Sequence, residues 1–149
     1  MNEYETIVVA RPELPADESK RLHDRLLATI EKHKGSLLIT EDWGKRRLAY
    51  LIQRQQYGNY IYYNYAGPAE LPLEIDRNHA NEDNLLRFLT VRLGTEVDVE
   101  ERRLAAEERH RIRKEKLAAQ AAAAAEANYE DMMMGEDEEG DMIIDRDMG

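Results

Sequence analysis

Six cationic side chains fall in stretches that otherwise have the character of strands: Lys45, Arg46, Arg47, Arg54, Arg87 and Arg92. Cations on neighbouring strands can follow a phosphate backbone, and the planar guanidinium of arginine also makes bidentate contacts. Any one of them is about as well explained as an ordinary solvated residue on the outer face of a sheet. As a group they favour contact with RNA or with a partner protein.

Tyrosines are the second group of candidate binding residues, and five of them lie within residues 57–65. Alternation along a strand sends Tyr60 and Tyr62 to one face and the next tyrosines to the other, so about half should be core. The outward rings could stack on bases or line a protein interface. The pattern departs from the RNA-recognition motif, which places a basic residue, a glycine and then alternating aromatics on its third strand. The candidates for a sheet-face interface are Tyr4, Tyr50, Tyr60 and Tyr62.

Catalytic chemistry finds little support in the sequence. Cysteine is absent, which excludes disulfides, thiolate nucleophiles and cysteine-based zinc sites. The four histidines have no metal-ligand spacing, and neither serine has a neighbouring base. The loop over 11–15 contains two prolines and a glutamate, so it is unsuited to cradling a phosphate. We therefore expect a chain that is not an enzyme and needs no metal or cofactor.

The charge of the chain is uneven along its length. It has 149 residues and a formal net charge of -10, from 31 acidic and 21 basic residues. Residues 128–149 hold nine of the acidic residues and one basic residue, which leaves 22 acidic and 20 basic residues in 1–127. The chain also lacks a secretory pattern and any apolar run of about 18 residues, so we expect a cytosolic protein that does not enter membranes.

The elements that would position these side chains follow from apolar spacing and turn residues. In chain order they are a strand over 4–10, a helix over 16–34 that Gly35 stops in a left-handed conformation, a strand over 36–52 bent near Gly44, a hairpin loop over 55–59, a strand over 60–65, a short helix around 71–79 and a strand over 85–93. This order predicts an α+β, ferredoxin-like βαββαβ fold: a four-stranded antiparallel sheet with two helices on one face. The other face stays available for binding.

The C-terminal third has a different composition. Residues 99–127 are rich in helix formers but poor in large apolar residues, which predicts a solvated helix. Its basic stretch over 109–116 resembles RNA-binding arms, although a helix with internal charge pairs explains it equally well. Residues 128–149 have the acidic composition of a disordered tail. We thus expect a folded domain over 1–98, a helix over 99–127 and a disordered tail.

Three segments resemble a known family: Met1–Glu5 leading into the first strand, Arg46–Tyr50 with Gly58 shortly after, and Asn84–Arg92. Together they resemble the bacterial small-subunit ribosomal protein six family over about residues 1–95. The chain departs from the family pattern at Leu51, where proline is usual, and at Arg54, where lysine is common. Both departures bear on local strand geometry and leave the fold in place.

The resemblance implies a structural role without catalysis. It implies binding to the central domain, or platform, of 16S ribosomal RNA together with ribosomal protein eighteen, and no association with DNA or membranes. By position in the family motifs, Arg46, Arg47, Arg87 and Arg92 are candidate contacts to RNA or to that partner. Two alternatives stay open on the residues alone: a ferredoxin-like domain that senses a metabolite, and a free-standing binder of single-stranded RNA.

Overall fold

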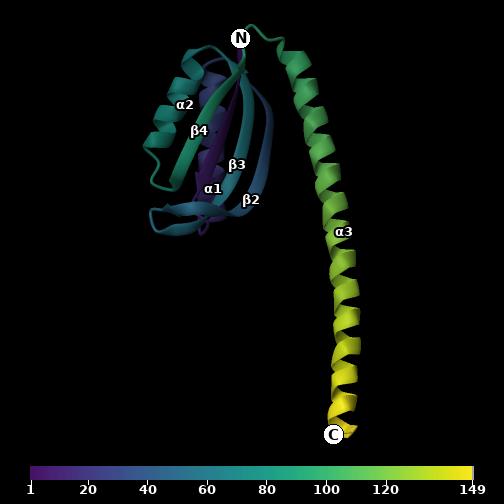
Figure 1. The fold of residues 1–149 in the computed structure, drawn as a ribbon. Coiled ribbons are helices and arrows are strands. Elements are labelled where there is room, and N and C mark those ends of the chain that lie inside the picture. The colour runs from purple at the N-terminus through teal and green to yellow at the C-terminus, as the bar shows by residue number, and fades with distance from the viewer. Residues whose placement is uncertain (149) are drawn as a thin grey trace. The chain divides into compact units, whose positions relative to one another are not determined.

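The computed structural model describes the backbone of residues 1–148 and the side chains of residues 1–134. The elements in chain order are β1 (Asn2–Ala10), α1 (Ala16–Lys32), β2 (Ser36–Ile52), β3 (Gln55–Gly67), α2 (Glu70–Ala80), β4 (Leu85–Gly94) and α3 (Val99–Met148) (Figure 1). The predicted βαββαβ order is confirmed. The chain forms two compact units, Met1–His110 and a second unit from Arg111 onward.

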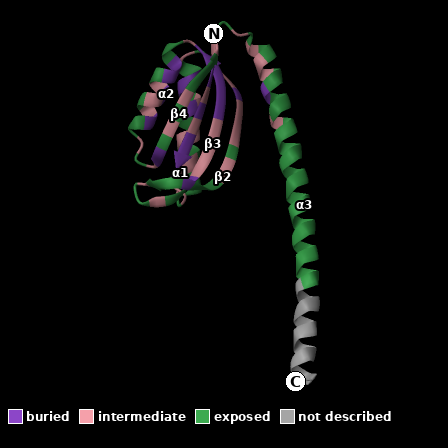
Figure 2. Ribbon diagram, in the orientation of Figure 1, coloured by how far each residue is buried: buried purple, intermediate pink, exposed green. Residues whose placement is uncertain are grey.

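The four strands form one antiparallel sheet in the order β2-β3-β1-β4. Helices α1 and α2 cover one face, where Leu26 and Ile30 of α1 meet Leu71 and Ile75 of α2 over the central strands. The central strands are accordingly mainly buried in Figure 2, whereas most of the described part of α3 is exposed. The opposite face of the sheet has no helix of the βαββαβ unit against it, as predicted.

The β2–β3 hairpin is longer than expected, and its turn lies elsewhere. The loop predicted over 55–59 is wrong, because β3 begins at Gln55 and the turn consists of Gln53 and Arg54, at φ 48° and 66°. Two consecutive residues with positive φ form the tight turn that matches strand twist. The bend near Gly44 is confirmed as a register shift with φ 76°. The hairpin tip packs Leu48 into a second small core.

The end of α1 also differs from the prediction. Lys34, with φ 59°, takes the left-handed conformation that we assigned to Gly35. Gly35 is instead required for close packing, because a Cβ there would lie 2.7 Å from the carbonyl oxygen of Ala66. The Gly35 amide donates to the carbonyl oxygen of Ile30 at 2.8 Å, which closes the helix.

Helix α3 begins at a side-chain cap and extends past its predicted end. The carboxylate of Asp98 accepts hydrogen bonds from the amides of Glu100 and Glu101, at 3.0 and 3.3 Å. We expected a helix over residues 99–127 and a disordered tail from 128, and α3 spans Val99–Met148. Alanine, glutamate and methionine are good helix formers and no proline interrupts them. No helix in the part of the chain that the structure describes is apolar and long enough to cross a membrane.

Candidate interface on the open sheet face

The open face is defined by the side chains that alternate with those of the core. Register pairs Ile7 of β1 with Tyr62 on β3 and with Leu89 on β4. In the next row Val9 pairs with Tyr60 and with Arg87. Partners in an antiparallel pair project to the same side, so these rows lie side by side on one surface. The prediction that Tyr60 and Tyr62 share a face opposite Tyr63 and Tyr65 is confirmed.

Aromatic rings and cations stack together where β2 meets β3. The Trp43 and Tyr62 rings are nearly parallel, at 7°, with centroids 5.2 Å apart. The Arg46 guanidinium lies 5.0 Å from the Trp43 centroid and 5.8 Å from that of Tyr60. Such contacts contribute about 0.5–1 kcal/mol each at exposed sites. Arg46 is thus held over aromatic rings with its polar edge available. Trp43 was not among the predicted interface residues.

The other predicted cations near this stack are all exposed but are spread along the hairpin. The ammonium of Lys45 lies 4.8 Å from the centroid of the Tyr57 ring. Arg47 pairs in register with Tyr57, and Arg54 lies in the turn itself. Lys45 and Arg47 alternate with Arg46 along β2 and therefore project to the opposite side of the sheet, while Arg54 is separated by the turn, so the hairpin does not gather its four basic residues at one point.

The hairpin tip reaches across to β4 at the lower end of the sheet in Figure 1. There Arg87 donates from Nη1 to the hydroxyl of Tyr50 at 2.9 Å, and the Tyr50 side chain is 63% exposed. Arg11 in turn donates to the side chain of Gln53 in the turn. The bond between Arg87 and Tyr50 joins β4 to β2 although these strands are the two edges of the sheet.

Tyr4 and Arg92, like Lys45 and Arg47, project to the other face. Tyr4 is 5% exposed and stacks on Tyr65 in the main core, so its assignment to the sheet-face interface is wrong. Arg92 pairs in register with Tyr4 and therefore projects to the helix-covered side, whereas Arg87 projects to the open face. Five positions separate the two arginines, and an odd spacing in a strand places side chains on opposite faces.

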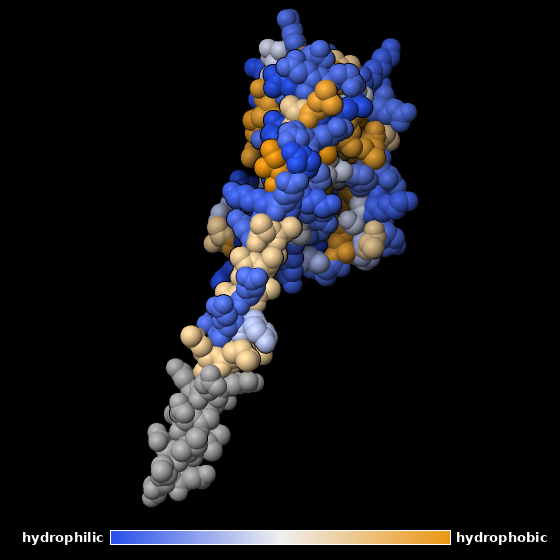
Figure 3. All heavy atoms as spheres, turned by 90° about the vertical axis from the view of Figure 1, so that its right-hand side faces the viewer, coloured by the Kyte–Doolittle hydropathy of each residue, from blue (hydrophilic) through white to orange (hydrophobic). Residues whose placement is uncertain are grey.

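An apolar row on β4 was missed by the sequence reasoning. Leu89, Val91 and Leu93 are 55%, 41% and 43% exposed, and they alternate along an edge strand. Figure 3 shows one side of the domain, where hydrophobic side chains lie among hydrophilic ones. Leu89, Val91 and Leu93 alternate with polar residues, the pattern of a strand with one apolar face. This pattern does not indicate which face of the sheet α1 and α2 cover.

The first turns of α3 contact the same face near its upper end. Glu3, only 1% exposed, accepts from Asn64 Nδ2 at 3.0 Å and faces the Arg102 guanidinium at 3.4 Å. Further along the helix, His110 Nδ1 lies 3.0 Å from a carboxylate oxygen of Glu41. The open face thus has three parts: a polar end beneath α3, an aromatic and basic centre, and an apolar edge.

Comparison with known proteins identifies the family of the chain that carries this face. The family model of Ribosomal protein S6 matches residues 3–92, which include all four strands of the sheet. The chain belongs to the ribosomal protein S6 family. It is accordingly a protein of the small subunit of the cytoplasmic ribosome and functions in translation.

Individual S6 relatives agree with this assignment. Small ribosomal subunit protein bS6 of Pelagibacter ubique is 37% identical over 93 residues, 62% of this chain and 77% of that protein. The protein of the same name from Geobacter sulfurreducens is 41% identical over 93 residues, 62% of this chain and 80% of its own length. The crystal structure of 30S ribosomal protein S6 from Thermotoga maritima matches in fold, with a TM-score of 0.57 and 23% identity, over 76% of this chain and 97% of that one.

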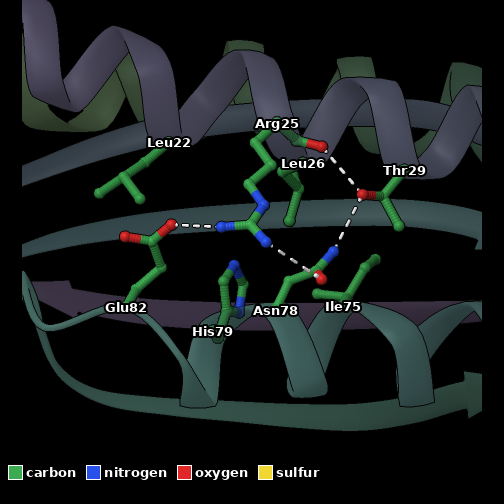
Figure 4. Close-up of a pocket in the computed structure, with 8 residues that line it drawn as sticks. All are labelled: Leu22, Arg25, Leu26, Thr29, Ile75, Asn78, His79 and Glu82. Carbon is green, nitrogen blue, oxygen red and sulfur yellow. Dashed lines mark hydrogen bonds and ion pairs between the residues drawn. The ribbon is translucent and has the colours of Figure 1, made fainter.

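On the helix side, this S6 domain has an enclosed polar cluster that is structural in character (Figure 4). The Arg25 guanidinium donates to Glu82 at 2.6 Å, and Asn78 donates to the hydroxyl of Thr29 at 3.2 Å. Burial lowers the pKa of His79 to about 4, so its ring is neutral near pH 7. Burial alone would raise the pKa of Glu82, but hydrogen bonds and charge from Arg21 and Arg25 lower it overall.

The space enclosed by this cluster is about 10 Å³, room for one water molecule at most. Two clefts elsewhere, of about 530 and 370 Å³, are open to solvent. Within residues 1–134, no group of three or more histidine, aspartate or glutamate side chains is placed to hold a metal ion. The open sheet face therefore carries the candidate site of this S6-family chain.

Proposed function

We propose that this chain binds the central domain of 16S ribosomal RNA together with ribosomal protein eighteen, through the open face of its sheet. Family membership supports a place in the small subunit. The observation that carries the proposal is the mixed character of the face, with the apolar row Leu89, Val91 and Leu93 beside the Arg46 stack. A surface for RNA alone would be richer in cations.

The apolar row suits the partner protein. The cores of protein interfaces are depleted of charge and enriched in apolar and aromatic side chains. The row lies on an edge strand of the sheet and is followed across the face by Ile7 and Tyr62. Arg87, held by Tyr50 at the lower end of the row, is placed to bridge protein and RNA.

RNA contact is assigned to the basic centre of the face, around Arg46. Neutralised phosphates set the affinity, and residues 1–127 hold 20 basic against 22 acidic residues, so the chain alone should bind RNA weakly. A basic partner bound to the apolar row would add phosphate contacts. We expect tight binding only when both proteins are present.

The alternatives are less well supported. A free-standing binder of single-stranded RNA needs ring faces for bases, but Trp43 and Tyr62 stack on each other and Arg46 lies over Tyr60. A metabolite sensor needs an enclosed pocket. Among the described residues, the space enclosed by the cluster around Arg25 and Glu82 holds no more than a water molecule, and the two larger clefts are open to solvent. We also propose that the chain has no catalytic activity, since His23, His33 and His110 make structural contacts and His79 is buried.

The test is a gel-shift titration of central-domain RNA with the full chain, with and without protein eighteen. Replacing Leu89, Val91 and Leu93 by threonine should abolish the partner-dependent gain in affinity, because threonine keeps strand propensity but removes apolar surface. The matched control is Leu73→Gln on α2, 71% exposed on the helix side. Tight binding by the wild-type chain without protein eighteen would overturn the proposal, as would full cooperativity in the triple variant.

A further inference from the structure

The first turns of α3 contact the polar end of the open face, and few groups hold them there. Residues 99–110 belong to the same compact unit as the sheet. Of these residues only Ala106 is buried, and their one leucine, Leu104, is 64% exposed. Burial of large apolar side chains is what normally stabilises a packed helix. Because this segment buries none, its attachment rests on polar contacts.

The polar contacts at this end are incomplete. Arg102 Nη1 lies 3.4 Å from Glu3 Oε1, whereas charge-assisted hydrogen bonds between such groups are about 2.7–2.9 Å long. Asn64 is fully buried and donates from Nδ2 to Glu3 and to the carbonyl oxygen of Tyr4, each at 3.0 Å. Among the described residues, its Oδ1 has no hydrogen-bond partner, and neither does the buried Nε of Arg103. The contact thus leaves a buried acceptor and a buried donor without hydrogen bonds, which is unfavourable.

The polar end carries three carboxylates and adjoins the apolar row on β4. The carboxylates are those of Glu3, Glu5 and Glu41. Glu5 pairs in register with Val91 of the apolar row, and neighbouring strands lie about 4.8 Å apart. A protein seated on the apolar row therefore reaches the polar end. Carboxylates attract cations and repel phosphates, so a basic protein segment fits this end and RNA does not.

We propose that residues 99–110 are an exchangeable cover of the polar end, and that a segment of the partner protein carrying an arginine takes their place. The proposal rests on the proposed function, which puts a basic partner on the apolar row. Arg102 shows what this end accepts, namely a guanidinium beside Glu3. A guanidinium has its N–H donors in a planar fork, so one from the partner can bond to Glu3 and to Asn64 Oδ1 together. The free chain holds its own cation there until the partner binds, which lowers the apparent affinity for the partner.

The test measures the affinity of the full chain for protein eighteen by calorimetric titration without RNA. Arg102→Gln removes the cation that competes for Glu3, and glutamine keeps helix propensity. We expect this variant to bind protein eighteen at least about 5-fold more tightly, the lower end of typical coupling between binding events. Ala106→Gln detaches the same turns by overpacking, without a change of charge, and should also raise the affinity. Urea unfolding of each variant establishes that the domain is folded.

A second substitution tests whether the partner uses Glu3. Adding Glu3→Gln to Arg102→Gln removes the acceptor from the domain and should reverse the gain in affinity. If affinity followed stability instead, the double variant would bind at least as well as the single one, because it has no uncompensated buried charge. That result would overturn the inference. Arg77→Gln, at an exposed position on α2, is the matched control and should leave the affinity unchanged.

Amide exchange of the wild-type chain reports the displacement itself. When protein eighteen is added, the amides of residues 99–110 should exchange faster, because a detached helix end frays. Unchanged or slower exchange there would overturn the inference, as would Arg102→Gln and Ala106→Gln variants that bind no more tightly than the wild type. A gain by Arg102→Gln in affinity for central-domain RNA alone would also overturn it, by assigning the polar end to RNA. These results leave the proposed function in place, whereas failure of the wild-type chain and protein eighteen to bind the RNA cooperatively would reject the proposed function itself.

Discussion

The contact between Arg102 and Glu3 gives the sharpest test of how α3 is attached to the domain. The Glu3 carboxylate is 1% exposed, and its described partners are Asn64 Nδ2 at 3.0 Å and the Arg102 guanidinium at 3.4 Å. Arg102→Gln removes the compensating charge and leaves the carboxylate buried. Removing one partner of a buried ion pair costs about 3–5 kcal/mol. Because the Arg102 side chain is 43% exposed and screened by solvent, we expect a smaller cost than this, about 2–3 kcal/mol.

The cost also depends on what the first turns of α3 can do. If residues 99–110 detach and water reaches Glu3, the loss is limited to the free energy that holds these turns in place. The variant should then unfold in urea close to the wild type, while amide exchange over residues 99–110 accelerates. If these turns stay bound, the full cost appears in the urea midpoint. Measuring both quantities separates local detachment from global destabilisation.

The matched control is the double variant Glu3→Gln with Arg102→Gln. Neutralising both partners removes the buried charge, and such replacements are often close to neutral. We therefore expect the double variant to be more stable than Arg102→Gln alone. Unchanged urea unfolding together with unchanged exchange in Arg102→Gln would refute the reasoning, as would a double variant that is no better than the single one.

Three further predictions concern other parts of the chain. Burial lowers the pKa of His79 from 6.5 to about 4, so between these pH values the unfolded chain binds a proton at this residue and the folded chain does not. The free energy of unfolding should therefore be highest above pH 6.5 and fall by about 3 kcal/mol as the pH drops to 4. In the variant His79→Gln, the urea midpoint should depend less on pH in that range. Gly58→Ala should cost about 1–3 kcal/mol by overpacking, because its Cβ would lie 2.3 Å from Val9 Cγ1, and adding Val9→Ala should recover part of that loss in thermal unfolding. Deleting residues 128–149 should leave the urea midpoint of the domain nearly unchanged, since the described side chains of 128–134 are exposed, and a loss of several kcal/mol would show that the segment docks.

The fold could be predicted because its elements follow local rules. Apolar alternation located β1 and β4, and the three-and-four spacing of Leu22, Leu26 and Ile30 located α1. The hairpin turn was missed because Gln53 and Arg54 are not typical turn residues, and nothing local in the sequence shows their positive φ. At the end of α1, Gly35 was correctly recognised as a necessary glycine but for the wrong reason, since its need comes from the distant Ala66.

The candidate site was harder to predict because it depends on which face the helices cover. The choice of Tyr60 and Tyr62 succeeded because alternation within one strand needs no knowledge of the fold. The predictions for Tyr4 and Arg92 were both wrong, because the two residues are register partners and both side chains project to the face that α1 and α2 cover. Arg87 pairs with Val9 instead and stays on the open face. Strand register is thus the information that a list of basic and aromatic residues lacks.

The attachment of α3 was missed for a related reason. Residues 99–127 hold too few large apolar residues for a core stripe, and this composition predicted a solvated helix. The stripe that packs consists of Arg102, Ala106 and His110, a spacing of four in which two members are ionisable. The partners of its ionisable members are carboxylates, Glu3 on β1 and Glu41 on β2, which come to lie on the same face only once the sheet has formed. A helix can therefore dock through charge and small side chains without a hydrophobic period, and complementary acidic positions on the predicted open face are the pattern that would reveal it.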